Sequence, residues 1–296
     1  MGKTIFSGSA AAITTPFKAD MSINYTAFEQ LIELQIANGT NAIVVCGTTG
    51  ESTALTDSEH KRLIKYCVNK VGGRVPVIAG TGSNNTAHAL DFSEFAKEVG
   101  ADAHLQITPY YNRTTQQGII DHFFYIADRV DLPMIVYNVP TRTGVNILPE
   151  TYAKLSTHKN IVAAKEASSN LSALAKTINL CHDRLDIYCG DDALTIPMLS
   201  LGAKGVISVL ANIMPMQTNE MCKLFFDGQI KQSAKMQTDL IGLINALFLD
   251  PNPIPIKAAQ NLMGLHAGSP RIPLTEPTNK CLDELKKQMR KHNLIS

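Results

Sequence analysis

The segment MIVYNVPTRTGVNILPETYAKLSTHKNIVAAKEAS, residues 134–168, decides the fold of this chain. It contains two apolar runs of strand character, 134–140 and 161–168, and a predicted helix over 148–160 with Pro149 in its first turn. A strand, a helix and a second strand in this order predict two parallel neighbours about 4.8 Å apart. Residues at similar heights in the two runs are therefore expected side by side.

Lys165 and Tyr137 stand at similar heights in these two runs. An ammonium group is costly to bury in an apolar strand, and desolvation favours the neutral amine, which attacks carbonyl groups. A phenol can exchange protons in a half-apolar site. Lys165 alone is more simply explained as a lysine that extends its charge to water from the strand end. A phenol and an amine on adjacent strand ends indicate a shared catalytic cavity instead.

The same alternation runs through the first 212 residues. Most strand candidates are continuous apolar runs, which is typical of strands covered on both faces, and amphipathic stretches such as 24–39, 57–73 and 86–101 lie between them. This spacing predicts an α/β fold, a (β/α)8 TIM barrel, with an open doubly wound sheet as the alternative. The strands are expected at 9–14, 42–47, 76–82, 103–109, 134–140, 161–168, 186–192 and 205–212.

Beyond residue 212 the sequence predicts helices only. The first of them completes the barrel, and the others form a C-terminal helical extension that contains a bend at Pro251, Pro253 and Pro255. We therefore expect a catalytic barrel over 1–228 and a helical region packed on it over 229–296. The helices are predicted at 214–228, 229–248, 253–264 and 276–293.

Composition excludes several classes of function. The 27 basic and 26 acidic residues leave no electrostatic footprint for nucleic acid or an anionic membrane, so a small polar ligand is expected. The amino-terminal MGKTIFSGSA lacks the apolar core of a signal peptide, and no apolar run reaches the length of a membrane span. The six cysteines show neither zinc-ligand spacing nor a disulfide framework. We expect a cytoplasmic protein without a metal or cofactor.

In a (β/α)8 barrel the chemistry lies at the carboxyl ends of the strands. A nucleophile, several hydroxyls and a guanidinium at these ends suit a carbonyl compound that carries a carboxylate. GTTGE (47–51) is able to hold a small carboxylate, although alone it is more simply a glycine-rich turn. The residues at these strand ends are Thr48, Thr49, Tyr110, Tyr111, Tyr137, Arg142, Lys165, Gly190, Asp191 and Asp192.

Two other readings of the seventh strand end are less favoured. Asp191 and Asp192 suggest a metal site, but adjacent carboxylates without further ligands rarely suffice, and Asp192 is better explained as the N-cap of the helix that follows. Their negative charge also disfavours a phosphosugar substrate at the loops after strands seven and eight.

Six motifs follow one another along the chain: GTTGES (47–52), TPYYNR (108–113), YNVPTRTG (137–144), AKEAS (164–168), CGDD (189–192) and PNPIPIK (251–257). Together they resemble the 4-hydroxy-tetrahydrodipicolinate synthase (formerly dihydrodipicolinate synthase) family, within the wider class of pyruvate-dependent Schiff-base aldolases and lyases. The resemblance covers essentially the whole chain. Sialic acid lyases and 2-keto-3-deoxy-sugar-acid aldolases are the alternative within the class, but they usually lack an arginine at the position of Arg142. A non-catalytic barrel that binds a keto acid is the alternative outside it.

The resemblance implies a lyase that condenses pyruvate with L-aspartate 4-semialdehyde, the first committed step of the diaminopimelate route to lysine. Lys165 would form the Schiff base with pyruvate, and Tyr137 would be the general acid and base. Thr48 and Tyr111 would relay protons to solvent, with Tyr111 supplied by a neighbouring subunit. The protein would thus be a homo-oligomer, either a dimer or a tetramer made of two dimers.

The resemblance also assigns the binding residues. Thr48 and Thr49 would hold the pyruvate carboxylate and Arg142 the semialdehyde carboxylate, while Gly190 and Ile207 would supply backbone contacts.

Feedback inhibition by lysine, found in many relatives, is expected to be weak or absent here. Thr53 stands where alanine is usual, Asp57 where histidine is usual, and His88 where a glutamate would pair with the ammonium of the ligand. The positions that match the inhibitor site are Ser52, Thr53, Asp57, His60, Asn84, His88 and Tyr110.

Overall fold

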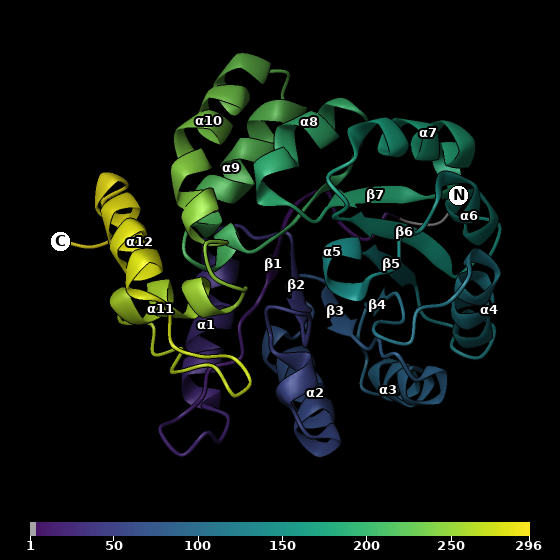
Figure 1. Cartoon of the computed structure of the whole chain (residues 1–296), viewed down its shortest axis with the longest axis horizontal. Coiled ribbons are helices and arrows are strands. Elements are labelled where there is room, and N and C mark those ends of the chain that lie inside the picture. Colours follow the sequence, from purple (N-terminus) through teal and green to yellow (C-terminus); the bar gives the residue numbers. More distant parts are fainter. Residues whose placement is uncertain (1–3) are drawn as a thin grey trace.

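The structure is a computed structural model that describes residues 4–296, so the first three residues of the amino-terminal segment discussed above lie outside the described part. Within residues 4–296, eight parallel strands pair in chain order and close into a barrel, with the helices outside (Figure 1). The predicted (β/α)8 TIM barrel is confirmed. Its strands are β1 (Gly8–Ala12), β2 (Ala42–Val45), β3 (Val77–Gly80), β4 (Ala103–Ile107), β5 (Met134–Asn138), β6 (Ile161–Glu166), β7 (Asp186–Cys189) and β8 (Gly205–Ser208).

Every strand begins within one residue of its predicted start but ends earlier than predicted. β4 ends at Ile107 and β5 at Asn138, each two residues before a proline that lacks the N–H of a strand ladder, Pro109 and Pro140. The residues cut from the predicted strands belong to the loops at the carboxyl end of the barrel. These loops carry most of the candidate site residues.

Helices between the strands cover the outside of the barrel. The predictions over 24–39, 57–73 and 86–101 are confirmed, whereas the helix predicted over 148–160 is shorter. Thr56 and Glu59 form a reciprocal capping box at the start of the second helix. The helices are α1 (Tyr25–Ala37), α2 (Asp57–Val71), α3 (Thr86–Glu98), α4 (Gln116–Ala127), α5 (Pro140–Thr143), α6 (Pro149–Leu155), α7 (Leu171–Cys181), α8 (Thr195–Ser200) and α9 (Pro215–Phe226).

Side chains fill the interior of the barrel. Val44, Ile78 and Ile135 pack there with Tyr188, and the ring of Phe6 stacks on Tyr188 with 4.2 Å between centroids. The Tyr188 hydroxyl also donates to the Phe6 carbonyl oxygen over 2.9 Å. Phe6 therefore closes the amino-terminal end of the barrel, which leaves the carboxyl end for ligands.

The C-terminal region consists of α10 (Ile230–Ala246), α11 (Ile254–Leu262) and α12 (Asn279–Lys291). These helices lie on one side of the barrel, beside α9 (Figure 1). Their apolar cluster includes Leu243, Ile256 and Leu285 together with Val209 and Leu210, which follow β8. The region thus shares a core with the barrel. Among the described residues, no helix combines the length and apolar character needed to cross a membrane.

Candidate active site

Tyr137 on β5 and Lys165 on β6 are direct partners in the register of the two strands. The Nζ atom of Lys165 lies 4.4 Å from the centroid of the Tyr137 ring. Each residue is only 6% exposed. The structure therefore brings together the amine and the phenol, as the sequence predicts.

The surroundings of Lys165 favour its neutral form. Burial, helped by the nearby Arg142 guanidinium, lowers the pKa of Lys165 to about 8 against the opposing effect of the Asp192 carboxylate. An amine with this pKa is about one-tenth neutral at pH 7, several hundred times the fraction for an ordinary lysine. Lys165 is thus suited to nucleophilic attack on a carbonyl group.

The pKa of Tyr137 is shifted in the opposite direction to that of Lys165. Burial raises the pKa of Tyr137 to about 12, opposed by the positive charge of Arg142 and by a hydrogen bond with Thr48. The phenol is therefore protonated near neutral pH and begins a reaction as a proton donor.

Lys165 lines a cavity of about 410 Å³ at the carboxyl end of the barrel. A neighbouring cavity of about 200 Å³ shares Thr48, Tyr137 and Arg142 with it. One wall of the larger cavity comes from α10 and the segment after it, so the C-terminal region contributes to the site. Six predicted site residues line this larger cavity: Thr48, Thr49, Tyr137, Arg142, Lys165 and Gly190.

Gly190 leaves room for the lysine side chain. A Cβ atom at this position would lie 3.1 Å from Cε of Lys165 and 2.9 Å from Cβ of Ala167. Any larger residue would therefore push against the nucleophile.

Two predicted site residues lie elsewhere in the described chain. Ile207 is buried inside the barrel, in the apolar cluster that contains Tyr137, and does not line the cavity. Tyr111 is 92% exposed with φ of 71°, while its neighbour Tyr110 lines the smaller cavity. Within one chain, the Tyr111 side chain thus points to solvent rather than to Tyr137.

The predicted role of Asp192 as a helix N-cap is wrong. Asp191 is the cap, because its side chain accepts from the N–H of Ala193. Asp192 is turned inward and is 2% exposed, and its Oδ2 accepts from the N–H groups of Val209 and Leu210 over 2.8 and 3.0 Å. Asp192 therefore fixes the loop after β8 and places a negative charge near Lys165.

Glu166, next to Lys165, anchors the end of β6. The Tyr152 hydroxyl donates to its Oε2 over 2.7 Å, the Asn138 amide donates to both carboxylate oxygens, and the N–H of Ser168 donates to Oε1 over 2.7 Å. This support was not predicted from the sequence, although Asn138 and Glu166 directly follow Tyr137 and Lys165.

Asn252 is a second residue that the sequence argument missed. Its amide donates to Oγ1 of Thr49 over 3.0 Å, and its carbonyl oxygen accepts from Arg142 over 3.2 Å. Asn252 therefore links the two groups predicted to hold carboxylates. The quoted motif PNPIPIK (251–257) contained this residue, but no local pattern showed where it would lie.

A third cavity, of about 270 Å³, is lined by six of the seven residues at which the sequence predicts an inhibitor site: Ser52, Thr53, Asp57, His60, His88 and Tyr110. Nε2 of His88 lies 3.1 Å from Oδ1 of Asp57 in its lining, so the two side chains contact each other. Asn84 lies outside the lining, and its carbonyl oxygen accepts from the Asn112 amide. Ser52, Thr53 and Tyr110 line both this cavity and the 200 Å³ cavity.

Potential metal ligands were compared across the part of the chain that the structure describes. No group of three or more His, Cys, Asp or Glu side chains within it is arranged to hold a metal ion. The six cysteines are free and buried.

Comparisons with known proteins agree with this geometry. Residues 5–292 match the model of the dihydrodipicolinate synthetase family. The chain is 51% identical over 293 residues to the 4-hydroxy-tetrahydrodipicolinate synthase of Clostridium tetani, with 99% of each chain covered, and 49% identical over 295 residues to that of Acetivibrio thermocellus, with 100% of each covered. The solved dihydrodipicolinate synthase of Cyanidioschyzon merolae with lysine bound superposes with a TM-score of 0.96 at 41% identity, covering 99% of this chain and 100% of that one. A lyase of this family condenses pyruvate with L-aspartate 4-semialdehyde on the route to diaminopimelate and lysine, and this chain belongs to the dihydrodipicolinate synthetase family.

Proposed function

We propose that Lys165 carries the condensation of pyruvate with L-aspartate 4-semialdehyde through a Schiff base. The neutral amine attacks the ketone of pyruvate, water leaves, and an iminium ion forms. Loss of a methyl proton gives an enamine, which bonds to the aldehyde carbon of the semialdehyde. The amine of the semialdehyde then attacks the iminium carbon, closes the ring and releases Lys165. The pairing of Lys165 with Tyr137 across β5 and β6 is the observation that carries this proposal.

Tyr137 is the general acid and base in this proposal. Its protonated phenol gives a proton to the departing oxygen of the pyruvate ketone and recovers one from the methyl group. Thr48, which hydrogen-bonds Tyr137, continues the relay toward solvent. Tyr111 completes the relay from a neighbouring subunit, and its 92% exposure in the single chain supports this assignment.

The carboxylates of the two substrates are held at different points of the cavity. Thr48 and Thr49 bind the pyruvate carboxylate, and Arg142 binds that of the semialdehyde. Gly190 and Ile207 supply backbone contacts. The presence of Thr48, Thr49, Arg142 and Gly190 in one cavity lining supports these assignments, whereas Ile207 is buried in the barrel and is not part of that lining.

The assembly that follows is a homo-oligomer, either a dimer or a tetramer of two dimers, in the cytoplasm. The functional parts are a catalytic barrel over 1–228 and a helical region over 229–296 that walls one side of the cavity. The core shared between Leu243 and Val209 supports a helical region packed firmly on the barrel.

Lysine, which is bound in the Cyanidioschyzon merolae structure, is a weak ligand at most in this protein. The carboxylate of Asp57 is already engaged by His88, and no glutamate stands at position 88 to receive the ammonium group.

The decisive experiment measures condensation of pyruvate with L-aspartate 4-semialdehyde beside cleavage of N-acetylneuraminate. Turnover in the first assay alone supports the proposal. Turnover in the second would assign the chain to the sialic acid lyases, and a pyruvate adduct without turnover in either would indicate a keto-acid-binding protein.

A further inference from the structure

A buried ion pair joins the loop after β2 to the C-terminal region. Nζ of Lys257, on α11, lies 2.8 Å from Oε1 of Glu51, and the two side chains are 1% and 0% exposed. Lys257 also donates to the carbonyl oxygens of Thr15 and Ser269, each over 3.1 Å. The three protons of the ammonium group thus have three acceptors. Unlike Lys165, this buried lysine is fully committed to partners.

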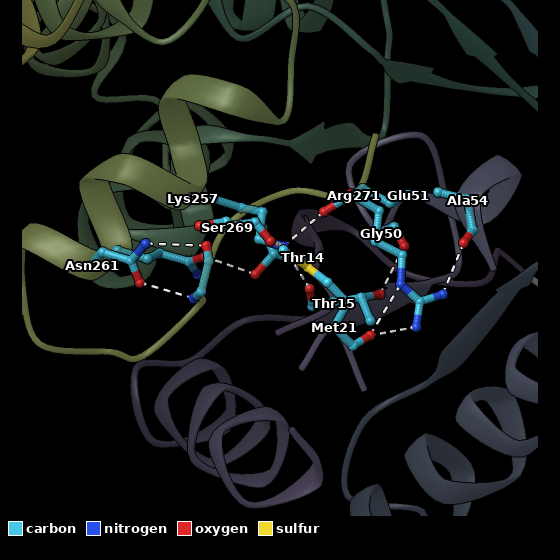
Figure 2. Close-up of polar contacts among 12 residues, drawn as sticks. Thr14, Thr15, Met21, Gly50, Glu51, Ala54, Lys257, Asn261, Ser269 and Arg271 are labelled. Carbon is cyan, nitrogen blue, oxygen red and sulfur yellow. Dashed lines mark hydrogen bonds and ion pairs between the residues drawn. The ribbon is translucent and has the colours of Figure 1, made fainter. Parts of the chain in front are cut away.

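Arg271 holds the other side of Glu51. Its backbone N–H donates to Oε2 of Glu51 over 2.9 Å, and its guanidinium donates to the carbonyl oxygen of Ala54 and to Glu59. Figure 2 shows Lys257 and Arg271 reaching Glu51 from the C-terminal segments. Glu51 has φ of 54°, an unfavourable backbone angle for a residue with a side chain. Its two carboxylate oxygens therefore fix a strained turn.

The strained turn is continuous with the proposed carboxylate-binding residues. The N–H of Glu51 donates to the carbonyl oxygen of Thr48 over 3.1 Å, and the N–H of Gly50 donates to that of Gly47 over 3.0 Å. The Thr15 hydroxyl donates to the carbonyl oxygen of Gly50 over 2.7 Å. A displacement of Glu51 therefore moves the backbone of Thr48.

We propose that Glu51 and Lys257 are a positioning pair, which holds Thr48 and Thr49 in the geometry needed to bind the pyruvate carboxylate. This inference rests on the proposed roles of the two threonines. Burial of an ion pair adds little to stability compared with apolar residues of the same shape, so stability alone is a poor reason for the pair. The pair instead fixes the direction of the loop, and with Arg271 it makes the C-terminal region part of the pyruvate site.

The test compares Glu51→Gln, Lys257→Met and the double variant with the control Gln260→Met. Gln260 lies one turn further along α11, is fully buried, and has its hydrogen bonds with Thr14 and Asn212 rather than with Glu51 or the loop residues 47–50. Each protein is assayed for the KM of pyruvate, the KM of the semialdehyde, the yield of borohydride-trapped adduct and the melting temperature.

We expect the KM of pyruvate to rise about 10- to 100-fold in the Glu51 and Lys257 variants, because small displacements of binding groups have effects of this size. The KM of the semialdehyde should change less than twofold. In the double variant the melting temperature should recover relative to Lys257→Met, because no unpaired charge remains, while the KM of pyruvate stays high. Gln260→Met should leave the KM of pyruvate unchanged even where its melting temperature falls.

A normal KM of pyruvate in the folded double variant, or an equal rise in Gln260→Met, would overturn the inference. If Lys257→Met fails to fold, Glu51→Gln decides, because glutamine keeps the volume and the acceptor for Lys257 but has one acceptor oxygen fewer for the N–H of Arg271. Failure of the proposed function has a separate signature, which is the absence of trapped pyruvate on Lys165 in the unmodified protein.

Discussion

Tyr137 and Lys165 occupy partner positions on adjacent parallel strands, so the distance between phenol and amine is fixed by the ladder of the barrel itself. Neither residue depends on a mobile loop for its place. Placement on strands suits a reaction in which the phenol must stay within reach of the substrate bound to Lys165 while the imine becomes an enamine.

Covalent trapping tests the nucleophile. Treatment with pyruvate and borohydride should add one pyruvyl group per chain, mapped to the peptide that contains Lys165. Lys165→Ala should carry no adduct, while Lys257→Met, which changes the other buried lysine of the pyruvate site, should still be labelled at Lys165 at saturating pyruvate. An adduct on another peptide would refute the mechanism.

The pH dependence of trapping follows from the lowered pKa of Lys165. The rate of adduct formation should rise as the pH passes through about 8, because the neutral amine is the reactive form. In the unfolded chain the ammonium loses its proton near the ordinary lysine pKa of 10.5, so the folded chain binds fewer protons between these two pKa values. Burial of the charge is therefore costly below pH 8. Lys165→Met should raise the melting temperature at pH 7, and this gain should disappear toward pH 10.5.

Asp192→Asn tests the charge behind the lysine. Asparagine retains an acceptor for the N–H groups of Val209 and Leu210 but removes the negative charge that raises the pKa of Lys165. The midpoint of the pH profile for trapping should move about one unit lower. Asp191→Asn, one residue away at the cap of Ala193, is the matched control and should leave the midpoint in place.

Arg142→Ala should raise the KM of the semialdehyde about 100-fold, equivalent to about 2.7 kcal/mol, because a charge-assisted contact to its carboxylate is lost. Arg142→Lys should recover part of this loss, since it restores the charge without the planar fork. The KM of pyruvate should change much less. Unaltered kinetics for the semialdehyde would remove Arg142 from the site.

Subunit mixing tests the place of Tyr111. Lys165→Ala and Tyr111→Phe should each be nearly inactive, yet a mixture that exchanges subunits should regain activity at about a quarter of its sites, because half the dimers are mixed and one site in each is intact. Absence of rescue despite proven exchange would mean that Tyr111 acts within its own chain.

Titration with L-lysine tests the third cavity. Half-inhibition should require more than about 1 mM lysine, because no glutamate stands at position 88 and the Asp57 carboxylate already contacts His88, which weakens its pairing with the ammonium group of lysine. The exchange Asp57→His with His88→Glu should create sensitivity, and inhibition of the unmodified protein below 1 mM would contradict this account.

Local sequence patterns were sufficient for the barrel and for the central pair of the site. Continuous apolar runs located the strand starts, and the parallel register placed Lys165 beside Tyr137. Contacts between residues far apart in the sequence could not be predicted from those patterns. Asn252 meets Thr49 across 203 residues and Lys257 meets Glu51 across 206, and no periodicity encodes such approaches. Asp192 was misassigned because two adjacent aspartates compete for one cap.

The contact between Glu51 and Lys257 also orders events during protein synthesis. The eight strands, with Lys165 and Tyr137 among them, leave the ribosome before Lys257 and Arg271 do, and amino-terminal parts of a chain begin to fold first. Until the C-terminal segments have been made, the loop at Thr48 and Thr49 therefore lacks the partners that fix Glu51. The strand that carries Lys165 is synthesised first, and the loop proposed to bind the pyruvate carboxylate is completed only when α11 docks on the barrel.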